Sequence, residues 1–433
     1  MALVERDAPE TLTRQVYRRV RDMILDGKLA AGSRVTSTRR MAQDLGVSRN
    51  VVLNAFDQLY AEGYLVTRAG AGTFVAQGVR RGPGEGAARG RRTGRSPTSV
   101  SSGLVFGPTG PAAGLPPLPR NGIDFRSGLP ELSLFPVKRW QRLSREVWES
   151  IGPRDLSYGQ PEGRPELRIE VARYVAEHRG VRCDPDQVVI TAGTTQAAGI
   201  ATRVLVGRGH AACIVEDPLT SDIKRIVAGA GGSIVPVPVG DRGLAVERLP
   251  AAARPAMIYV TPSHQFPLGS TMPIASRLRL LEYARARGAY VVEDDYDSEF
   301  RYDSPPLSSI QGLDPGRVLY IGTFSKTLCP ALRTGYLILP PGLVERGRQG
   351  KWFADLHNPS PDQIVLARFL EEGHFARYVH RMGKVYRARR AALVASLRRH
   401  FGNDVEILGS PAGIHLCARF ARRTFDHRLV TEI

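Results

Sequence analysis

Residues 318–326 read VLYIGTFSK, and this stretch decides the fold class of the larger part of the chain. Val318–Ile321 is a short apolar run typical of a buried strand, and a turn rich in hydroxyls, with the amine of Lys326, follows it directly. Similar runs occur upstream with helical stretches between them: Val188–Thr191, Cys213–Glu216, Met257–Val260 and Tyr290–Glu293. This alternation predicts an α/β domain with a mainly parallel sheet wrapped by helices, in which ligands bind at the carboxyl ends of the strands.

Chemically active residues follow three of these runs. The segment TAGTTQ at 191–196 opens a helix whose free N–H groups can bind a phosphate. The segment EDDYD at 293–297 carries carboxylates where an unpaired charge would be costly. Lys326 is followed seven residues later by Arg333, a side chain that can grip a phosphate with two hydrogen bonds. Each feature alone is ordinary, but the combination matches what pyridoxal phosphate requires.

Four motifs stand in a fixed order along this region: YGQPEG at 158–163, TPSHQFPLG at 261–269, EDDYDSEFRY at 293–302 and GTFSKTLCPALRTGY at 322–336. They resemble the motifs of fold-type I aminotransferases as these occur in MocR-type regulators, a GntR subfamily that joins a winged helix to an aminotransferase-like domain. The resemblance covers nearly all of residues 123–417. It implies that Lys326 forms the Schiff base with pyridoxal phosphate and that Asp294 partners the pyridine nitrogen. It further implies contacts to the ring hydroxyl from Tyr296, to the phosphate from Gly193, Thr194, Thr195, Thr323, Ser325 and Arg333, and to the substrate side from Tyr158.

The sequence departs from the aminotransferase pattern in three places. Phe266 stands where aminotransferases have an asparagine for the ring hydroxyl, so we expect His264 to take that role. Leu219 and Thr220 stand where a Gly-Tyr pair is usual. The sequence ends at Ile433, whereas relatives continue with an arginine that grips the substrate carboxylate. We therefore expect a C-terminal small domain that is incomplete, and cofactor binding that is separable from transamination.

The N-terminal residues predict a winged helix. Apolar residues from Leu12 to Ile24 follow helical spacing, a second helix fits between Ser37 and Gly46, and a third begins after Ser48. Two β-prone runs, 64–66 and 73–75, follow with a glycine-rich tip between them. Helix, turn, helix and wing would place a set of side chains against the phosphates and base edges of double-stranded DNA: Arg39, Ser48, Arg49, Asn50, Arg68 and Thr73.

This region also resembles a known family. RVRDMILDGKLAAGSRV, STRRMAQDLGVSRNVVLNAFDQLYAEGYL and GTFV are similar to the winged helix of GntR-type bacterial transcriptional regulators, and the match spans Leu12 to Val75. It implies that Arg39, Ser48, Arg49 and the tip at 70–73 lie on DNA. Thr36 stands where the family usually has a proline before the second helix.

Charge and composition divide the chain of 433 residues into three zones. The formal net charge is +18, which favours a polyanionic partner such as nucleic acid. Residues 78–120 are rich in Gly, Pro, Ser and Arg and predict a flexible linker, whose arginines either remain solvated or add a weak phosphate contact. The expected domains are therefore a winged helix at 1–77, the linker at 78–120 and an aminotransferase-like domain at 121–433.

The remaining signals concern compartment and metal. The 4 cysteines are far apart, so we expect neither a disulfide framework nor a metal site. The N-terminus lacks the apolar run of a signal peptide, and no stretch approaches the ~18 apolar residues of a membrane span. We expect a cytoplasmic protein with no membrane partner.

Three functional hypotheses remain open at this point. The first is a homodimeric transcriptional regulator whose DNA affinity responds to pyridoxal phosphate, alone or with an amino compound as effector. The second is a working aminotransferase with a DNA-binding appendage. The third is a DNA-binding regulator whose large domain is only a cofactor-free dimerisation scaffold. An absorption band that borohydride removes would separate the third hypothesis from the other two.

Overall fold

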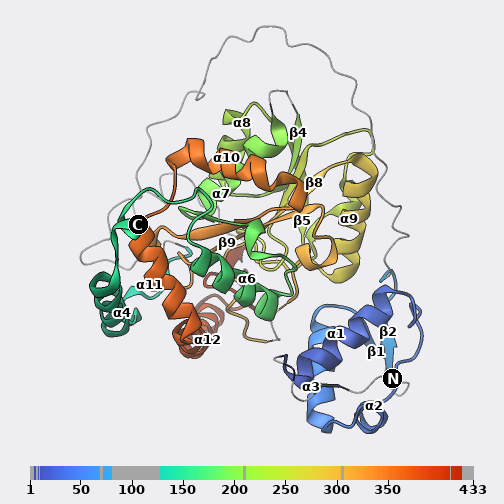
Figure 1. Ribbon diagram of the computed structural model, residues 1–433. Coiled ribbons are helices and arrows are strands. Elements are labelled where there is room, and N and C mark those ends of the chain that lie inside the picture. Colours follow the sequence, from blue (N-terminus) through green and yellow to red (C-terminus); the bar gives the residue numbers. More distant parts are fainter. Residues whose placement is uncertain are drawn as a thin grey trace.

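The computed structural model describes residues 4–5, 8, 10–68, 72–79, 127–207, 211–303, 307–409 and 411–421. A small N-terminal body lies beside a larger α/β body (Figure 1). Of the predicted linker only Gly78 and Val79 are described, and Val79 is buried in the same apolar cluster as the N-terminal helices. The predicted DNA contact at Gly70 lies outside the described residues.

The N-terminal body is the predicted winged helix. Serine hydroxyls start its second and third helices, since Ser37 Oγ accepts from the N–H of Arg40 at 3.3 Å and Ser48 Oγ accepts from that of Val51 at 3.4 Å. Ser37 caps its helix without the proline that the family usually carries at position 36. The elements are α1 (Leu12–Leu25), α2 (Thr38–Leu45), α3 (Arg49–Ala61), β1 (Leu65–Arg68) and β2 (Gly72–Val75).

The wing is an antiparallel hairpin of β1 and β2. Its first strand is longer than the sequence predicted, because Arg68 pairs with Gly72 inside the hairpin instead of lying in the tip. The guanidinium of Arg68 lies 4.4 Å from the centre of the Phe74 ring, a cation–π contact that holds it against the wing.

The large body is built on an eight-stranded sheet in the order β3-β10-β9-β8-β7-β4-β5-β6. Strands β4, β5, β7, β8 and β9 run parallel to one another, whereas β10 runs antiparallel between β3 and β9, and β6 runs antiparallel to β5. The mainly parallel sheet is thus confirmed, and so are all five predicted strands. The strands are β3 (Val188–Thr191), β4 (Ala212–Asp217), β5 (Ser233–Gly240), β6 (Gly243–Leu244), β7 (Met257–Val260), β8 (Tyr290–Asp295), β9 (Val318–Thr323) and β10 (Gly335–Ile338).

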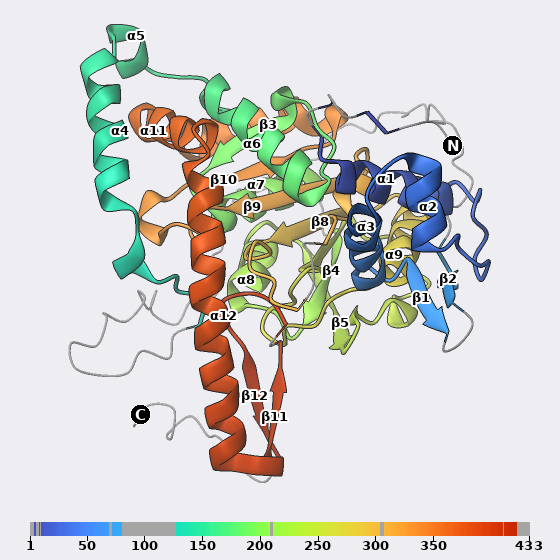
Figure 2. The ribbon, with the colours of Figure 1, turned by 90° about the horizontal axis from the view of Figure 1, so that it is seen from below.

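Helices cover both faces of this sheet (Figures 1 and 2). Alternate strand residues point to opposite faces, so Val292 and Leu319 pack with α7 whereas Val291 and Val318 pack with α9. The same alternation sends Ile190 of β3 toward α6. The helices are α4 (Val137–Ser150), α5 (Pro153–Leu156), α6 (Pro165–Arg179), α7 (Thr194–Val206), α8 (Ser221–Gly229), α9 (Ile274–Arg287), α10 (Val344–Asp355) and α11 (Ser360–Glu371).

The C-terminal part begins with a long helix, α12 (His374–Phe401), which extends away from the sheet (Figure 2). A two-stranded antiparallel hairpin of β11 (Val405–Leu408) and β12 (Cys417–Phe420) follows it. Residues 422–433, on which the expectation about the small domain bears, lie outside the described part. Within the described residues no helix is both long and apolar enough to cross a membrane.

Candidate cofactor site and nucleic-acid interface

The turns after β3 and β9 lie together because β10 joins the two strands. Gly335 of β10 is paired with Thr191 of β3 on one side and with Thr323 of β9 on the other. A Cβ on Gly335 would come within 2.9 Å of the Cα of Gly193, so glycine is required for this approach. The sheet therefore brings together the phosphate-type turn and the lysine loop, as the sequence predicted.

The turn after β3 has the features of an anion site. Gly193 has φ +97° and precedes α7, whose first residues are the half-exposed Thr194 and the exposed Thr195. The guanidinium of Arg333 lies over this glycine, 3.3 Å from where a Cβ would stand, and it donates to the carbonyl of Ala192. These groups gather at the N-terminus of α7, and we call them the cradle.

The lysine loop adds two hydroxyls to this cradle. Thr323 Oγ1 accepts from the N–H of Ser325 at 3.1 Å, which tightens the turn that leads to Lys326. Ser325 Oγ is buried and has no hydrogen-bond partner among the described residues. A buried hydroxyl without a partner is uncommon, and an incoming acceptor such as a phosphate oxygen would satisfy it.

Lys326 and Asp294 form the charged centre of the site. Asp294 Oδ2 accepts from the hydroxyl of Tyr259 at 2.6 Å, whereas its Oδ1 is buried and has no partner among the described residues. Burial raises the pKa of Asp294 to about 7, and burial lowers the pKa of the Lys326 amine against the attraction of Asp297 and Asp294. Each group is thus closer to its neutral form than it would be in water.

A hydrogen-bonded cluster lies next to this pair. His264 Nδ1 lies 3.0 Å from Asp297 Oδ2 and 3.3 Å from the hydroxyl of Tyr296. The ring centres of His415 and His264 lie 4.5 Å apart with the rings tilted, and burial lowers the pKa of His415 to about 4. In the described part of the chain, His264, Asp297 and His415 form the one group whose possible metal-ligand atoms lie within 4.8 Å of one another. The contact between His264 and Asp297 is accounted for by their hydrogen bond.

Three residues that the sequence does not predict, Lys351, Asn358 and Gln196, hold the backbone of the cradle in place. Lys351 of α10 is fully buried, and its Nζ donates to Gln196 Oε1 at 3.0 Å and to Asn358 Oδ1 at 2.6 Å. Asn358 in turn donates to the backbone carbonyl of Arg333 at 3.2 Å, and Gln196 accepts from the N–H of Ala192 at 2.8 Å. Asp355 and Asn358 follow Lys351 by 4 and 7 residues, but Gln196, the partner that reaches the turn after β3, lies 155 residues earlier, so no local pattern links Lys351 to the cradle.

Within the described residues, Tyr158 makes no contact with Lys326, Asp294 or the cradle. Its side chain is 83% exposed, and its ring faces His357 at 6.1 Å.

Most of the predicted DNA-facing residues that the structure describes are exposed in the winged helix. Arg39 in α2, and Arg49 and Asn50 at the start of α3, are exposed. Ser48 is exposed too, and its hydroxyl can still donate to a phosphate while it caps α3. In the wing, Gly72 with φ +105° lies against the guanidinium of Arg34, and the Thr73 hydroxyl bonds with that of Tyr60. Arg34 is not among the DNA-facing residues that the sequence predicts.

Comparison with known proteins agrees with both parts of the chain. Residues 12–75 match the model for bacterial regulatory proteins of the gntR family, and residues 120–432 match that for aminotransferase class I and II. The chain is 39% identical over 433 residues to the probable rhizopine catabolism regulatory protein MocR of Rhizobium meliloti, covering 99% of this chain and 86% of the relative. The chain belongs to the MocR-type regulators of the GntR family.

Proteins similar to this MocR-type regulator include both transcriptional regulators and aminotransferases. The pyridoxine biosynthesis transcriptional regulator PdxR of Corynebacterium glutamicum is 30% identical over 90% of this chain and 79% of its own. Among solved structures, the α-aminoadipate aminotransferase LysN of Thermus thermophilus, complexed with a phosphopyridoxyl-leucine, is 30% identical with a TM-score of 0.63, covering 69% of this chain and 76% of its own. The chain is therefore a DNA-binding transcriptional regulator with an aminotransferase-like domain.

Proposed function

We propose that this regulator binds pyridoxal phosphate in its large domain and that the occupied site changes its affinity for double-stranded DNA. The observation that carries the proposal is the buried Asp294 Oδ1, which has no partner among the described residues and lies beside the half-buried amine of Lys326. A pyridinium N–H would satisfy that oxygen and neutralise its charge. The residues present fit the cofactor on this ground.

Each part of the site would hold one part of the cofactor. Lys326 would hold the aldehyde carbon, Asp294 the ring nitrogen, and Tyr296 with His264 the ring hydroxyl. Gly193, Thr194, Thr195, Thr323, Ser325 and Arg333 would hold the phosphate. We infer that Tyr158 lies on the substrate side, where its exposure leaves it free to meet a ligand or a second protomer.

Bound pyridoxal phosphate supplies an aldehyde that condenses with amines and a ring that accepts electrons. The residues of the protein would hold the cofactor in a largely buried site that contains Asp294 and Lys326. Tyr259 donates to Asp294 and so orients the carboxylate, and the lowered pKa of Lys326 keeps a larger fraction of its amine in the nucleophilic form. An amino compound that competes with Lys326 for the aldehyde is the effector class that this arrangement favours.

The N-terminal domain would read DNA by the geometry usual for helix-turn-helix proteins. α3 would enter the major groove with Arg49 and Asn50 toward base edges, and Arg39 and Ser48 toward phosphates. Arg68, Gly72 and Thr73 of the wing, with Gly70, would meet the neighbouring backbone. The net charge of +18 supports such a polyanionic partner.

We further propose that the chain acts as a homodimer with domains at 1–77 and 121–433 joined by the linker at 78–120. Large apolar side chains are exposed on several helices of the large domain, including Trp148 of α4 at 56% and Phe353 of α10 at 85%. Faces of this kind mark interaction sites, and a symmetric second copy would cover them. The cytoplasmic location remains a prediction.

The proposal is tested by adding pyridoxal phosphate to the purified protein. We expect a visible absorption band that borohydride removes, and a change in the Kd for a duplex selected from a random pool. A protein that takes up no cofactor would leave only the scaffold hypothesis. Steady turnover of an amino donor and a keto acid that depends on Lys326 would instead identify an aminotransferase.

A further inference from the structure

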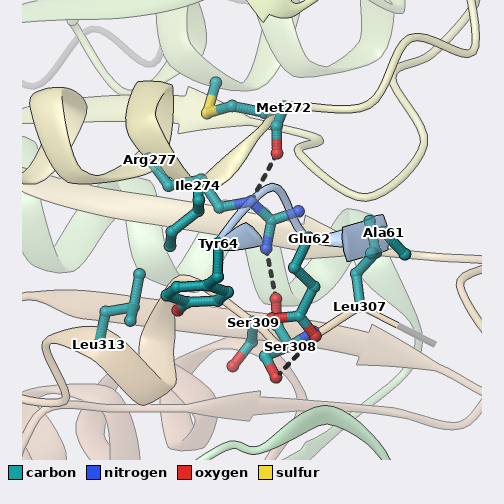
Figure 3. Close-up of a pocket in the computed structure, with 10 residues that line it drawn as sticks. All are labelled: Ala61, Glu62, Tyr64, Met272, Ile274, Arg277, Leu307, Ser308, Ser309 and Leu313. Atoms are coloured by element: carbon teal, nitrogen blue, oxygen red, sulfur yellow. Dashed lines mark hydrogen bonds between the residues drawn. The ribbon is translucent and has the colours of Figure 1, made fainter. Parts of the chain in front are cut away.

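The winged helix and the large domain share a packed boundary. Tyr64 after α3 is fully buried and belongs to the same apolar cluster as Ile274 and Leu278 of α9. The N–H of Ile274 donates to the backbone carbonyl of Glu62 at 3.2 Å. Figure 3 shows the small pocket at this boundary, lined from both domains. We call the residues Tyr17, Glu62 and Ser308, with the buried Arg277, the domain seam.

A buried carboxylate lies at the centre of the domain seam. Glu62 is 7% exposed and accepts from the hydroxyl of Tyr17 at 2.5 Å on one oxygen. Its other oxygen accepts from the N–H of Ser308 at 3.0 Å and from its hydroxyl at 3.2 Å. The hydroxyls of Tyr17 and Ser308 also lie 2.8 Å apart. A charge from the DNA-binding domain is thus bound directly to one segment of the large domain.

Two buried arginines fix that segment from the other side. The guanidinium of Arg277 donates to the carbonyl of Ser308 and, at 2.8 Å, to that of Met272 (Figure 3). The guanidinium of Arg179 donates to the carbonyl of Leu307, and its own carbonyl accepts from the N–H of Ser309 at 2.7 Å. The segment 307–309 therefore cannot shift without moving these arginines.

Arg179 also reaches the cofactor site. Its Nε donates to Asp295 Oδ2 at 2.6 Å, and it donates to Ser263 Oγ at 2.7 Å. Asp295 directly follows Asp294, and Ser263 directly precedes His264. Arg179 and Asp295 are both almost completely buried, so their ion pair is poorly screened and sensitive to a nearby change of charge.

We infer that the contacts from Asp295 through Arg179 and the segment 307–309 to Glu62 and Tyr17 couple the cofactor site to the DNA-binding domain. The inference rests on the proposed function and names the residues through which that regulation acts. A cation at Asp294 alters the field at Asp295, the Arg179 pair adjusts, and the adjustment reaches the winged helix at the domain seam. Coupling along these contacts is measured as the change in the effect of the cofactor when one contact is removed.

The test uses the full chain with Tyr17→Phe, which keeps the buried ring but removes the hydroxyl that bonds Glu62 and Ser308. The control is Tyr283→Phe, which removes a hydroxyl that donates to the carbonyl of Pro250 at 2.9 Å, away from the domain seam. Two quantities are measured with and without pyridoxal phosphate: the Kd for a duplex selected from the random pool, and hydrogen exchange of the amides in α1. Glu62→Gln serves as a second variant of similar volume.

In the wild type and in Tyr283→Phe we expect the cofactor to change both quantities. In Tyr17→Phe and Glu62→Gln we expect the ratio of the two Kd values to fall at least five-fold toward one. By thermodynamic reciprocity, the effect of duplex on cofactor affinity should fall by the same factor.

The outcomes separate this inference from the proposed function. If the wild type couples and Tyr17→Phe keeps the same Kd ratio and the same exchange response, the inference is overturned and the proposed function stands. If the cofactor changes α1 exchange in the wild type but not in Tyr17→Phe, while the Kd never responds, the route stands and the proposed regulation of DNA binding fails. If the wild type takes up cofactor and neither quantity responds, both are overturned.

Discussion

Replacing Asp294 with asparagine should make the cofactor-free protein more stable and its hold on pyridoxal phosphate weaker. The amide can still accept from Tyr259, so the hydrogen bond at 2.6 Å survives the change. What the change removes is a charge that burial makes costly, since burial raises the pKa of Asp294 to about 7. The two effects have opposite signs because the charge is unfavourable in the empty site and favourable beside a pyridinium.

The pKa sets both the size and the pH window of the stability effect. A carboxyl whose folded pKa is about 7 against an ordinary 3.8 binds more protons in the folded state, so its contribution to stability is full below pH 4 and is lost as the pH rises to 7. At 1.36 kcal/mol per unit, the loss is roughly 4 kcal/mol. We therefore expect Asp294→Asn to match the wild type near pH 4 and to exceed it at pH 8 by up to that amount.

The binding effect follows from the lost ionic hydrogen bond. A hydrogen bond to a charged group contributes about 1.5–3 kcal/mol, which corresponds to a cofactor affinity roughly 10- to 150-fold weaker. Titration followed by the visible absorption of the bound cofactor measures this loss directly.

Tryptophan fluorescence makes the stability assay specific for the large domain. The 3 tryptophans, Trp140, Trp148 and Trp352, all lie in α4 and α10, and the winged helix contains none. At pH 8 the urea midpoint of Asp294→Asn should rise by roughly 1 M. The control Asp241→Asn changes an exposed side chain, and it should alter the free energy of unfolding by less than about 0.5 kcal/mol.

Two results would refute this reasoning. Unchanged cofactor affinity in Asp294→Asn would transfer the pyridine contact to Asp295 or Asp297. A urea midpoint at pH 8 that does not exceed that of the wild type would mean that burying the ionised Asp294 carboxylate does not destabilise the empty site.

Three further predictions concern the lysine, the DNA face and the support of the cradle. Lys326→Ala should abolish borohydride-trappable attachment while the protein stays folded, and a trappable adduct in this variant would contradict the assignment. Arg49→Ala should cost about 1–3 kcal/mol on the selected duplex and relax sequence preference, whereas Arg68→Ala should weaken selected and random duplexes alike in competition binding. Lys351→Met should weaken pyridoxal phosphate about ten-fold but leave the affinity for phosphate-free pyridoxal unchanged, and equal losses for both compounds would remove Lys351 from the phosphate cradle.

The elements that the sequence predicted well are those whose signals are local. Serine caps at Ser37 and Ser48 and the left-handed Gly46, with φ +65°, define the helices of the winged helix within a few residues. The strands β3 and β7 have the bounds expected from their apolar runs. Both signals arise from steric effects and hydrogen bonds between neighbouring residues, so they can be recognised in the sequence alone.

The features that were missed depend on distant parts of the chain. β10 is a run of four residues that looks like any buried apolar segment, and only its pairing with β3 and β9 makes it a strand. The hydrogen bond that links Lys351 to the cradle goes to Gln196, 155 residues earlier. Arg179 likewise pairs with Asp295, 116 residues later. A single lysine or arginine is usually a solvated surface residue, so no local reading distinguishes these two.

The antiparallel strand β10 also determines when the cofactor site can form during protein synthesis. The DNA-binding domain is complete once residue 79 has emerged from the ribosome, whereas the turns after β3 and β9 cannot be joined before Gly335–Ile338 has been made. At the usual 5–20 residues per second, roughly 10–50 s of translation separate the two events. A nascent chain therefore carries every residue of its DNA-binding domain well before the cofactor site that we propose to regulate it can form.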